Sequence, residues 1–591
     1  MNNPTPAIVA QSAVRRLPRL ALLLLCVAYL MPGLLGRGPW KSADVSSFGY
    51  MLALVGHPWD LTRWLEPMLL GHKPEIPALL PYWIGAWAIQ LAPWWRPDLA
   101  VRVVYALMLW GTFSATWYAV YYLARTPGAQ PVAFAFGGEA QPKDYARAIA
   151  DGGLLALLAS LGLAQLGHET TPALAQLFFG ALMFYGVAAA PYRRLGPTLA
   201  LLLGGLGMSL GGAPWLALVL GLGSLLLSLR ERIQPGRASP GEDAGHGYDA
   251  AALAAMAAPL ILGAGLAFGL QQFHWRIVWP GEGPASAGAQ AGSLLRLFIW
   301  FTWPTWPLAL WTLWRWRQQW LARHVALPLL FAGVIGIAAM LGAASDRVLL
   351  LALPALATLA AFALPTFRRS VSALVDWFTL LFFSGSALLI WLYWIAMQTG
   401  VPVKMASSVA RLTPGYVAQF SLPIFLIAVA ATLAWCWLVR WRTGRHRAAL
   451  WKTLVLPAGG VTLCWLLLMT LWLPALDHAL SYAPQVRAIQ QHTGPAPRCV
   501  AELGVDRPQL AALSYHGNYT LQPINSHTEC PWLVVKPEAV HLLQLIVDLH
   551  DWRLIGTFRR TSNASDDLLL YQRRPEAPLP EVPVIEPVIG P

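Results

Sequence analysis

Long apolar runs separated by short polar connections fill the first four-fifths of the chain. A helix that crosses a bilayer needs about 20 mostly apolar residues, and most of these runs approach that length. The pattern therefore predicts an all-α polytopic membrane protein with about 13 transmembrane helices. We place them near 17–36, 99–123, 151–167, 172–192, 197–210, 212–229, 250–272, 294–314, 325–344, 347–366, 374–399, 418–439 and 453–475.

The connection at 37–98 is much longer than the others and contains two amphipathic stretches, 46–55 and 78–93. Helices of this kind lie flat in the headgroup layer, with the apolar face toward the lipid. We therefore expect interfacial helices in this connection, and we expect that 78–93 does not cross the membrane.

The pattern changes after residue 475, where charge rises and the apolar runs shorten. Short runs rich in β-branched and aromatic residues begin at Arg498, Trp532, Trp552 and Leu568 and predict strands. Stretches with helical periodicity follow Ala483 and Glu538. The expected domains are a transmembrane domain at 1–475, a small α/β domain at 476–574 and a Pro-rich disordered tail at 575–591.

Composition and charge agree with a membrane protein. Apolar residues make up 57% of the chain and charged residues 12%, whereas a soluble domain has roughly a quarter charged residues. The net charge of +13 does not indicate nucleic-acid binding, because the cations cluster between the apolar runs, as cytoplasmic anchors do.

The positive-inside rule gives the expected orientation. Arg15, Arg16 and Arg19 precede the first run, so we expect a cytoplasmic N-terminus. With about 13 spans, the connection at 37–98 and the C-terminal domain then face the periplasm of a bacterial inner membrane. In that oxidising compartment Cys499 and Cys530 could form a disulfide.

Ionisable residues gather on the predicted outer face. Asp44, His72 and Lys73 lie in the connection at 37–98, and Glu169 lies in a polar break between two apolar runs. A carboxylate beside lipid favours a functional interpretation, because burying it there is costly. The alternative is a solvated loop whose charges pair with one another.

Carboxylates and cations together suit group transfer from a phosphate-bearing lipid. A carboxylate can accept the proton of an attacking hydroxyl, and cations stabilise the phosphate that departs. We name Asp44 and Glu169 as catalytic candidates and Lys73, Arg102 and Arg347 as donor-phosphate ligands. Further cavity candidates are His72, Tyr82, His168, His274 and Arg276.

The order of these motifs resembles the GT-C superfamily of membrane glycosyltransferases. It is most similar to the branch with the protein O-mannosyltransferases and the lipid A aminoarabinose transferase. The matching features are Pro39 to Asp44 in the first outer loop, Lys73 through Tyr82 and Trp83, Arg102, Glu169 followed by Pro172, and Arg347 followed by Pro354.

The resemblance implies a GT-C-like fold and inverting transfer of a hexosyl or pentosyl group from a polyprenyl-phosphate donor. The acceptor would be a hydroxyl or phosphate of a lipid, glycan or protein at the periplasmic face, with Asp44 as the base. The sequence departs from the family where Val45 replaces a second acid and His72 replaces the acid before Lys73. The sugar, the acceptor and a divalent metal therefore stay open.

Two other functions are compatible with the sequence. A transporter or flippase of lipid-linked saccharides predicts charges near the bilayer midplane and broken spans in paired halves. A non-catalytic scaffold, whose outer domain binds a partner, predicts that the charges of the first outer loop are dispensable.

Overall fold

The fold is described from a computed structural model of the chain. It describes residues 5–233, 249–273, 287–342, 345–367, 369–444, 449–494, 499–525, 528–560 and 563–574. The predicted Pro-rich tail, His274 and Arg276 lie outside these residues.

The chain divides into two compact units, which we describe separately. The first unit comprises 1–36, 76–398 and 419–473, and the second comprises 37–75, 399–418 and 474–591. The sequence analysis placed its boundary at 475, close to the last of these divisions. It assigned 37–75 and 399–418 to the transmembrane domain, whereas their contacts group them with the C-terminal part.

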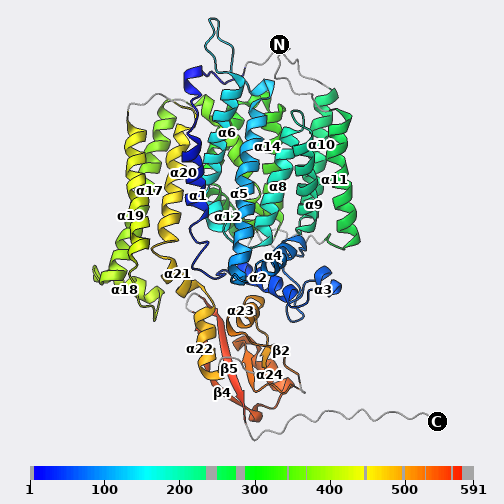
Figure 1. Ribbon diagram of the computed structural model, residues 1–591, viewed down its shortest axis with the longest axis vertical. Helices are drawn as coiled ribbons and strands as arrows, with labels where there is room; N and C mark the ends of the chain where they lie inside the picture. The colour runs from blue at the N-terminus through cyan, green and yellow to red at the C-terminus, as the bar shows by residue number, and fades with distance from the viewer. Residues whose placement is uncertain are drawn as a thin grey trace, which may run out of the picture. The chain divides into compact units, whose positions relative to one another are not determined.

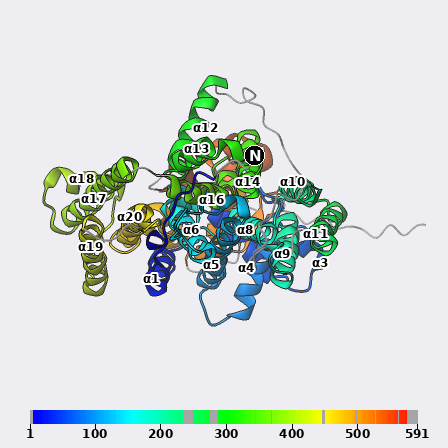
Figure 2. The ribbon, with the colours of Figure 1, turned by 90° about the horizontal axis from the view of Figure 1, so that it is seen from above.

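The first unit is helical, and many of its helices run side by side (Figures 1 and 2). Its helices are α1 (Arg19–Leu30), α4 (Leu80–Leu91), α5 (Pro97–Ala124), α6 (Pro142–Ala159), α7 (Leu161–Leu166), α8 (Pro172–Ala189), α9 (Leu195–Leu210), α10 (Pro214–Ile233), α11 (Ala250–Gly269), α12 (Ala287–Phe301), α13 (Thr305–Arg315), α14 (Arg323–Leu341), α15 (Ser345–Leu350), α16 (Leu353–Ala363), α17 (Arg369–Thr399), α19 (Leu422–Thr443) and α20 (Lys452–Leu468).

The centre of the first unit is built from α5, α6, α8 and α16, which pack on one another. Every residue of α16 is buried. Small residues let these helices approach closely. At Gly153 of α6, for example, an added Cβ would lie 2.8 Å from Cγ2 of Val120 in α5, so a larger residue would push the two helices apart.

Among the described residues, six helices are long and apolar enough to cross a membrane, or seven if the bent pair Lys452–Leu468 and Leu473–Leu480 counts as one span. The chain is therefore a multi-pass membrane protein. Several predicted runs are interrupted: 151–167 divides between α6 and α7, and 347–366 divides between α15 and α16. The prediction of about 13 spans stays a prediction, as does the periplasmic location of the outer parts.

The second unit holds a five-stranded sheet with strand order β2-β1-β3-β5-β4. Strand β1 pairs in parallel with β2 and β3, while β5 runs antiparallel to β3 and β4. Its elements are α2 (Ser42–Val55), α3 (Leu61–Leu65), α18 (Val403–Leu412), α21 (Leu473–Leu480), which begins at the unit boundary, α22 (Ala483–Thr493), β1 (Val500–Leu503), α23 (Arg507–Gly517), β2 (Leu521–Pro523), β3 (Trp532–Val535), α24 (Val540–Ile546), β4 (Trp552–Arg560) and β5 (Asn563–Arg573).

The predicted small C-terminal sheet is confirmed, and its four expected strands correspond to β1, β3, β4 and β5. The sequence analysis missed β2 and α23. The apolar pattern of α23 is weak because its buried residues include Gln509, two alanines and a glycine.

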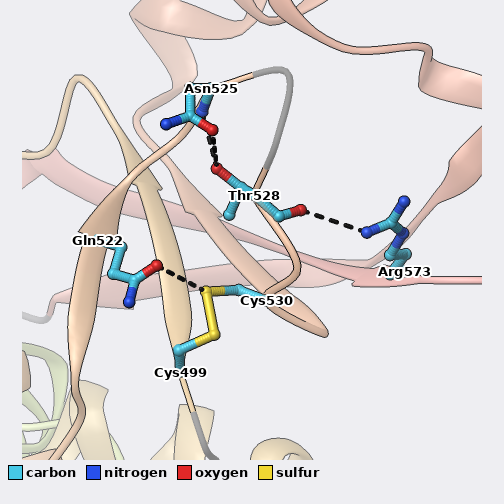
Figure 3. The surroundings of a disulfide bond; sticks show 6 residues. All are labelled: Cys499, Gln522, Asn525, Thr528, Cys530 and Arg573. Atoms are coloured by element: carbon cyan, nitrogen blue, oxygen red, sulfur yellow. Dashed lines mark hydrogen bonds between the residues drawn. A yellow bond between two sulfur atoms is a disulfide. The ribbon is translucent and has the colours of Figure 1, made fainter. Parts of the chain in front are cut away.

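A disulfide joins Cys499, just before β1, to Cys530, just before β3 (Figure 3). Both cysteines adjoin neighbouring parallel strands. Beside the bridge, the backbone carbonyl of Thr528 accepts a hydrogen bond from Arg573 at 3.2 Å, which ties this turn to the end of β5. The pair that the sequence analysis named is thus joined in the structure.

Candidate active site

The first candidate centre is the polar break between α7 and α8. Helix α7 ends at Leu166 and is followed by Gly167, where an added Cβ would lie 2.6 Å from the Leu163 carbonyl oxygen. Pro172 opens α8, as is common in the first turn of a helix. The residues between them therefore leave the helical path, and Glu169, Thr170 and Thr171 are buried there.

Glu169 meets Arg347 in this break, although the two lie far apart in the sequence. Nη2 of Arg347 lies 3.4 Å from Oε2 of Glu169, and the two side chains are 20% and 5% exposed. Short helix α15 brings Arg347 there by packing on α7 and α8. The contact is longer than the 2.7–2.9 Å typical of a strong charge-assisted hydrogen bond.

Asp346 is a second carboxylate beside the same guanidinium. Its Oδ1 lies 3.9 Å from Nη1 of Arg347 and accepts the Arg347 backbone N–H at 2.9 Å. Among the described residues, no acceptor is found for the buried Nε of Arg347. Much of the hydrogen-bonding capacity of this guanidinium therefore remains for a further anion.

His168 points to other helices. Its Nε2 lies 3.0 Å from the Tyr29 carbonyl oxygen of α1, and its ring stacks on Trp465 of α20 at 4.3 Å between centroids. These contacts fix the first half of the break against α1 and α20. His168 is thus a packed neighbour of Glu169.

Arg102, another candidate for the donor phosphate, has a different environment. It forms an ion pair with Asp98, whose side chain is fully buried. Its Nε donates to the Asp98 carbonyl oxygen at 3.1 Å, and its Nη1 donates to the Leu34 carbonyl oxygen at 2.8 Å. All three nitrogens of this guanidinium have partners within the first unit.

The second unit contains Asp44, which lies buried in the first turn of α2. The positive end of the helix dipole favours an acid at this position. Helix α2 packs on α23, and Phe48 meets Tyr515 edge to face at 4.8 Å. Asp44 is therefore held on a fixed helix.

The segment before α2 is fixed by partly buried polar contacts to the C-terminal part of the same unit. Asp477 accepts from the Trp40 indole N–H at 2.7 Å and from the Gly38 backbone at 3.0 Å. Arg560 donates to the Trp40 carbonyl oxygen at 3.0 Å and to Asp566 at 2.6 Å. The C-terminal domain thus fixes the start of α2 and, with it, the position of Asp44.

His72 and Lys73 follow a tight turn in which Leu70 and Gly71 have φ of 48° and 81°. Positive φ at both central positions is typical of a type I′ turn. Lys73 lies 3.7 Å from Glu66 in an exposed pair. The Tyr50 hydroxyl donates to the His72 carbonyl oxygen at 3.2 Å. Burial raises the pKa of this phenol to about 12.

Tyr82, in the first unit, is buried in α4, and its hydroxyl donates to the Ile76 carbonyl oxygen at 3.2 Å. The described residues contain no group of three or more His, Cys, Asp or Glu side chains that could hold a metal ion.

The structure thus brings Glu169 and Arg347 together in the first unit, while His168 packs on α1 and α20. Asp44, His72 and Lys73 belong to the second unit. The sequence analysis did not name several polar residues that fix these groups: Asp98, Asp346, Asp477, Arg560 and Asp566. The signal that identifies them is a contact with a partner that is adjacent or distant in the sequence, and it becomes visible only in three dimensions.

Two solved structures share the fold of this chain. No protein-family model and no curated protein matches the sequence. The crystal structure of ArnT from Cupriavidus metallidurans bound to undecaprenyl phosphate aligns with a TM-score of 0.59 and 13% identity, over 94% of this chain and 98% of that one. The apo state of the same protein aligns with a TM-score of 0.58 and 13% identity, over 94% and 97%. At this identity the likeness establishes the fold alone: the chain shares the fold of ArnT, as the sequence resemblance led us to expect.

Proposed function

We propose that this chain, a multi-pass membrane protein with the GT-C fold, transfers a sugar from a polyprenyl-phosphate carrier to a hydroxyl or phosphate of an acceptor. The structural neighbour was solved with undecaprenyl phosphate, which supports a lipid-phosphate donor. We place the reaction at the periplasmic face of the inner membrane, in keeping with the charge distribution along the sequence.

The observation that carries the proposal is the Glu169–Arg347 pair. A buried carboxylate and a guanidinium with spare donors meet at a break between apolar helices. A structural ion pair at this depth gains most when its geometry is tight. The long contact instead suits an arginine that pairs with Glu169 at rest and binds a phosphate when substrate arrives.

The proposed reaction has a simple balance. The bond between the sugar C1 and the carrier phosphate oxygen breaks as the acceptor oxygen bonds to C1. The carrier phosphate keeps the electron pair, and Arg347 stabilises its growing charge, with Lys73 as a second cation. The acceptor proton passes to a carboxylate, for which Asp44 is our first candidate and Glu169 the second.

Arg102 receives a different role in this proposal. Its guanidinium is occupied by Asp98 and two backbone carbonyls, so binding a phosphate would mean giving up those contacts. We therefore propose that Arg102 positions the start of α5, and that Arg347 contacts the donor.

The proposal is tested by a transfer assay in membranes that contain the full chain. A radiolabelled polyprenyl-phosphate sugar is supplied, and label that reaches acceptor material is measured for wild type, Asp44→Asn and Arg347→Gln. We expect transfer in wild type and its loss in both variants. Movement of the intact donor across vesicles without label transfer would instead favour a flippase.

A further inference from the structure

A second polar feature lies at the other end of α8 from the candidate active site. The connection Tyr192 to Arg194, between α8 and α9, and the start of α11 enclose a hollow of about 280 Å³. Helix α8 has 18 residues, so roughly 27 Å of helix separates this hollow from the break at Pro172. The two features are therefore distinct sites of the first unit.

The polar wall of the hollow is cationic. Arg193 and Arg194 line it together with the single acid Asp249, so the formal charges, two positive and one negative, sum to +1. Asp249 is engaged twice, because it caps α11 through Ala252 N–H at 2.7 Å and lies 3.1 Å from Arg194. The described residues show no carboxylate paired with Arg193. This wall has positive charge available for an anion.

An apolar wall completes the lining and lies at the level where membrane helices end. Pro197 and Leu201 of α9 and Ala255 of α11 form it. Helices α9 and α11 pack side by side, as Figure 2 shows, and both α8 and α11 have the length and composition of membrane spans. The end of a span lies at the headgroup layer. Basic pockets between helices at this level suit anionic lipid headgroups.

We propose that this hollow binds the phosphate diester of an anionic membrane phospholipid. Arg193 and Arg194 would hold the phosphate, and the apolar wall would contact the glycerol region. The volume is at the small end for ligand sites, which suits a headgroup whose acyl chains remain in the bilayer. Free phosphate shares the charge chemistry but gains nothing from Pro197, Leu201 and Ala255. This site does not depend on the proposed sugar transfer.

The test measures lipid binding to the purified full-length chain in mixed micelles. Dioleoyl phosphatidylglycerol is titrated and bound lipid is counted by native mass spectrometry, with dioleoyl phosphatidylcholine as the zwitterionic comparison. We expect Arg193→Gln with Arg194→Gln to weaken phosphatidylglycerol binding about tenfold, since two charge-assisted contacts are lost. The matched control is Arg315→Gln with Arg317→Gln, which removes the same charge from exposed positions at the end of α13 and in the turn that follows it.

Two further measurements distinguish a lipid phosphate from free phosphate and exclude misfolding as the cause of lost binding. Ala255→Leu fills the hollow but keeps both arginines, and we expect it to weaken lipid binding with an unchanged melting temperature. Inorganic phosphate at millimolar concentration should not displace the lipid. Equal loss of binding in the control pair, unchanged binding in the Arg193 and Arg194 variant, or full displacement by inorganic phosphate would each overturn the proposal.

Discussion

Two arginines of the first unit, Arg102 and Arg347, were both named as phosphate ligands from the sequence, with Arg102 ahead of Arg347, and the structure gives them different environments. Arg102 is 7% exposed and donates through all three nitrogens to Asp98 and to backbone carbonyls. Arg347 is 20% exposed and lies 3.4 Å from Glu169, with Nε lacking an acceptor among the described residues.

The difference separates a structural arginine from one that can bind substrate. A guanidinium whose donors are all satisfied inside a protein is costly to redirect, because the buried partners lose their hydrogen bonds to it. A loosely held guanidinium exchanges partners at smaller cost. Sequence position alone does not reveal this, since both arginines adjoin an acid and an apolar helix.

The largest expected effect concerns the stability that Arg102 provides. Arg102→Gln removes the buried partner of the Asp98 carboxylate and leaves only Arg96, whose side chain is 66% exposed. We therefore expect a loss of about 3 kcal/mol in the free energy of unfolding. Thermal unfolding of the purified chain measures it. The double variant with Asp98→Asn should be less destabilised than Arg102→Gln alone, and the reverse order would contradict a buried ion pair.

The next effect concerns catalysis by Arg347. Arg347→Gln removes the proposed contact to the departing phosphate, and we expect transfer to slow by about 10²–10³-fold. The loss of stability should be smaller than for Arg102→Gln, because the contact is longer and more exposed. Label transfer and thermal unfolding are measured on the same preparations. If Arg347→Gln instead lowers the stability strongly and leaves the transfer rate per folded molecule unchanged, Arg347 is a structural arginine and the comparison with Arg102 is wrong.

Glu169→Gln tests whether the carboxylate of the Glu169–Arg347 pair acts through Arg347. If Glu169 acts by holding Arg347, we expect transfer to fall about tenfold in the single variant and no further when Arg347→Gln is already present. Initial rates of the two single variants and the double variant measure this coupling. Fully additive losses would mean that Glu169 acts independently, for example as the base.

The smallest effect is expected at Lys73. Its contact with Glu66 is 3.7 Å long and lies in solvent. Lys73→Gln should therefore change the free energy of unfolding by no more than about 0.5 kcal/mol. Thermal unfolding tests this, and a loss comparable to that of Arg102→Gln would show that Lys73 is structural.

The sequence predicted the class of fold well because apolar runs and strand patterns are local signals. The strands β1, β3, β4 and β5 were found, since each is a short β-branched or aromatic run. The sequence analysis missed β2, which has only three residues. It also did not group 37–75 with the C-terminal part, because that grouping rests on long-range contacts such as Asp477 with Trp40.

The candidate residues were partly predictable for a similar reason. An ionisable residue between apolar runs is visible in the sequence, so Glu169 and Arg347 could be named. Their pairing, and the commitment of Arg102 to Asp98, depend on helix packing between distant segments. Local patterns carry no information about those partners.

The central claim, that Arg347 binds the phosphate of the lipid carrier, is tested most directly by polyprenyl-phosphate binding. The measurement uses a chain that carries Arg193→Gln and Arg194→Gln, so that the second phosphate site does not contribute. Adding Arg347→Gln to this background should weaken polyprenyl-phosphate binding about tenfold or more. Its effect on the melting temperature should be smaller than that of Arg102→Gln. Unchanged binding would contradict the account.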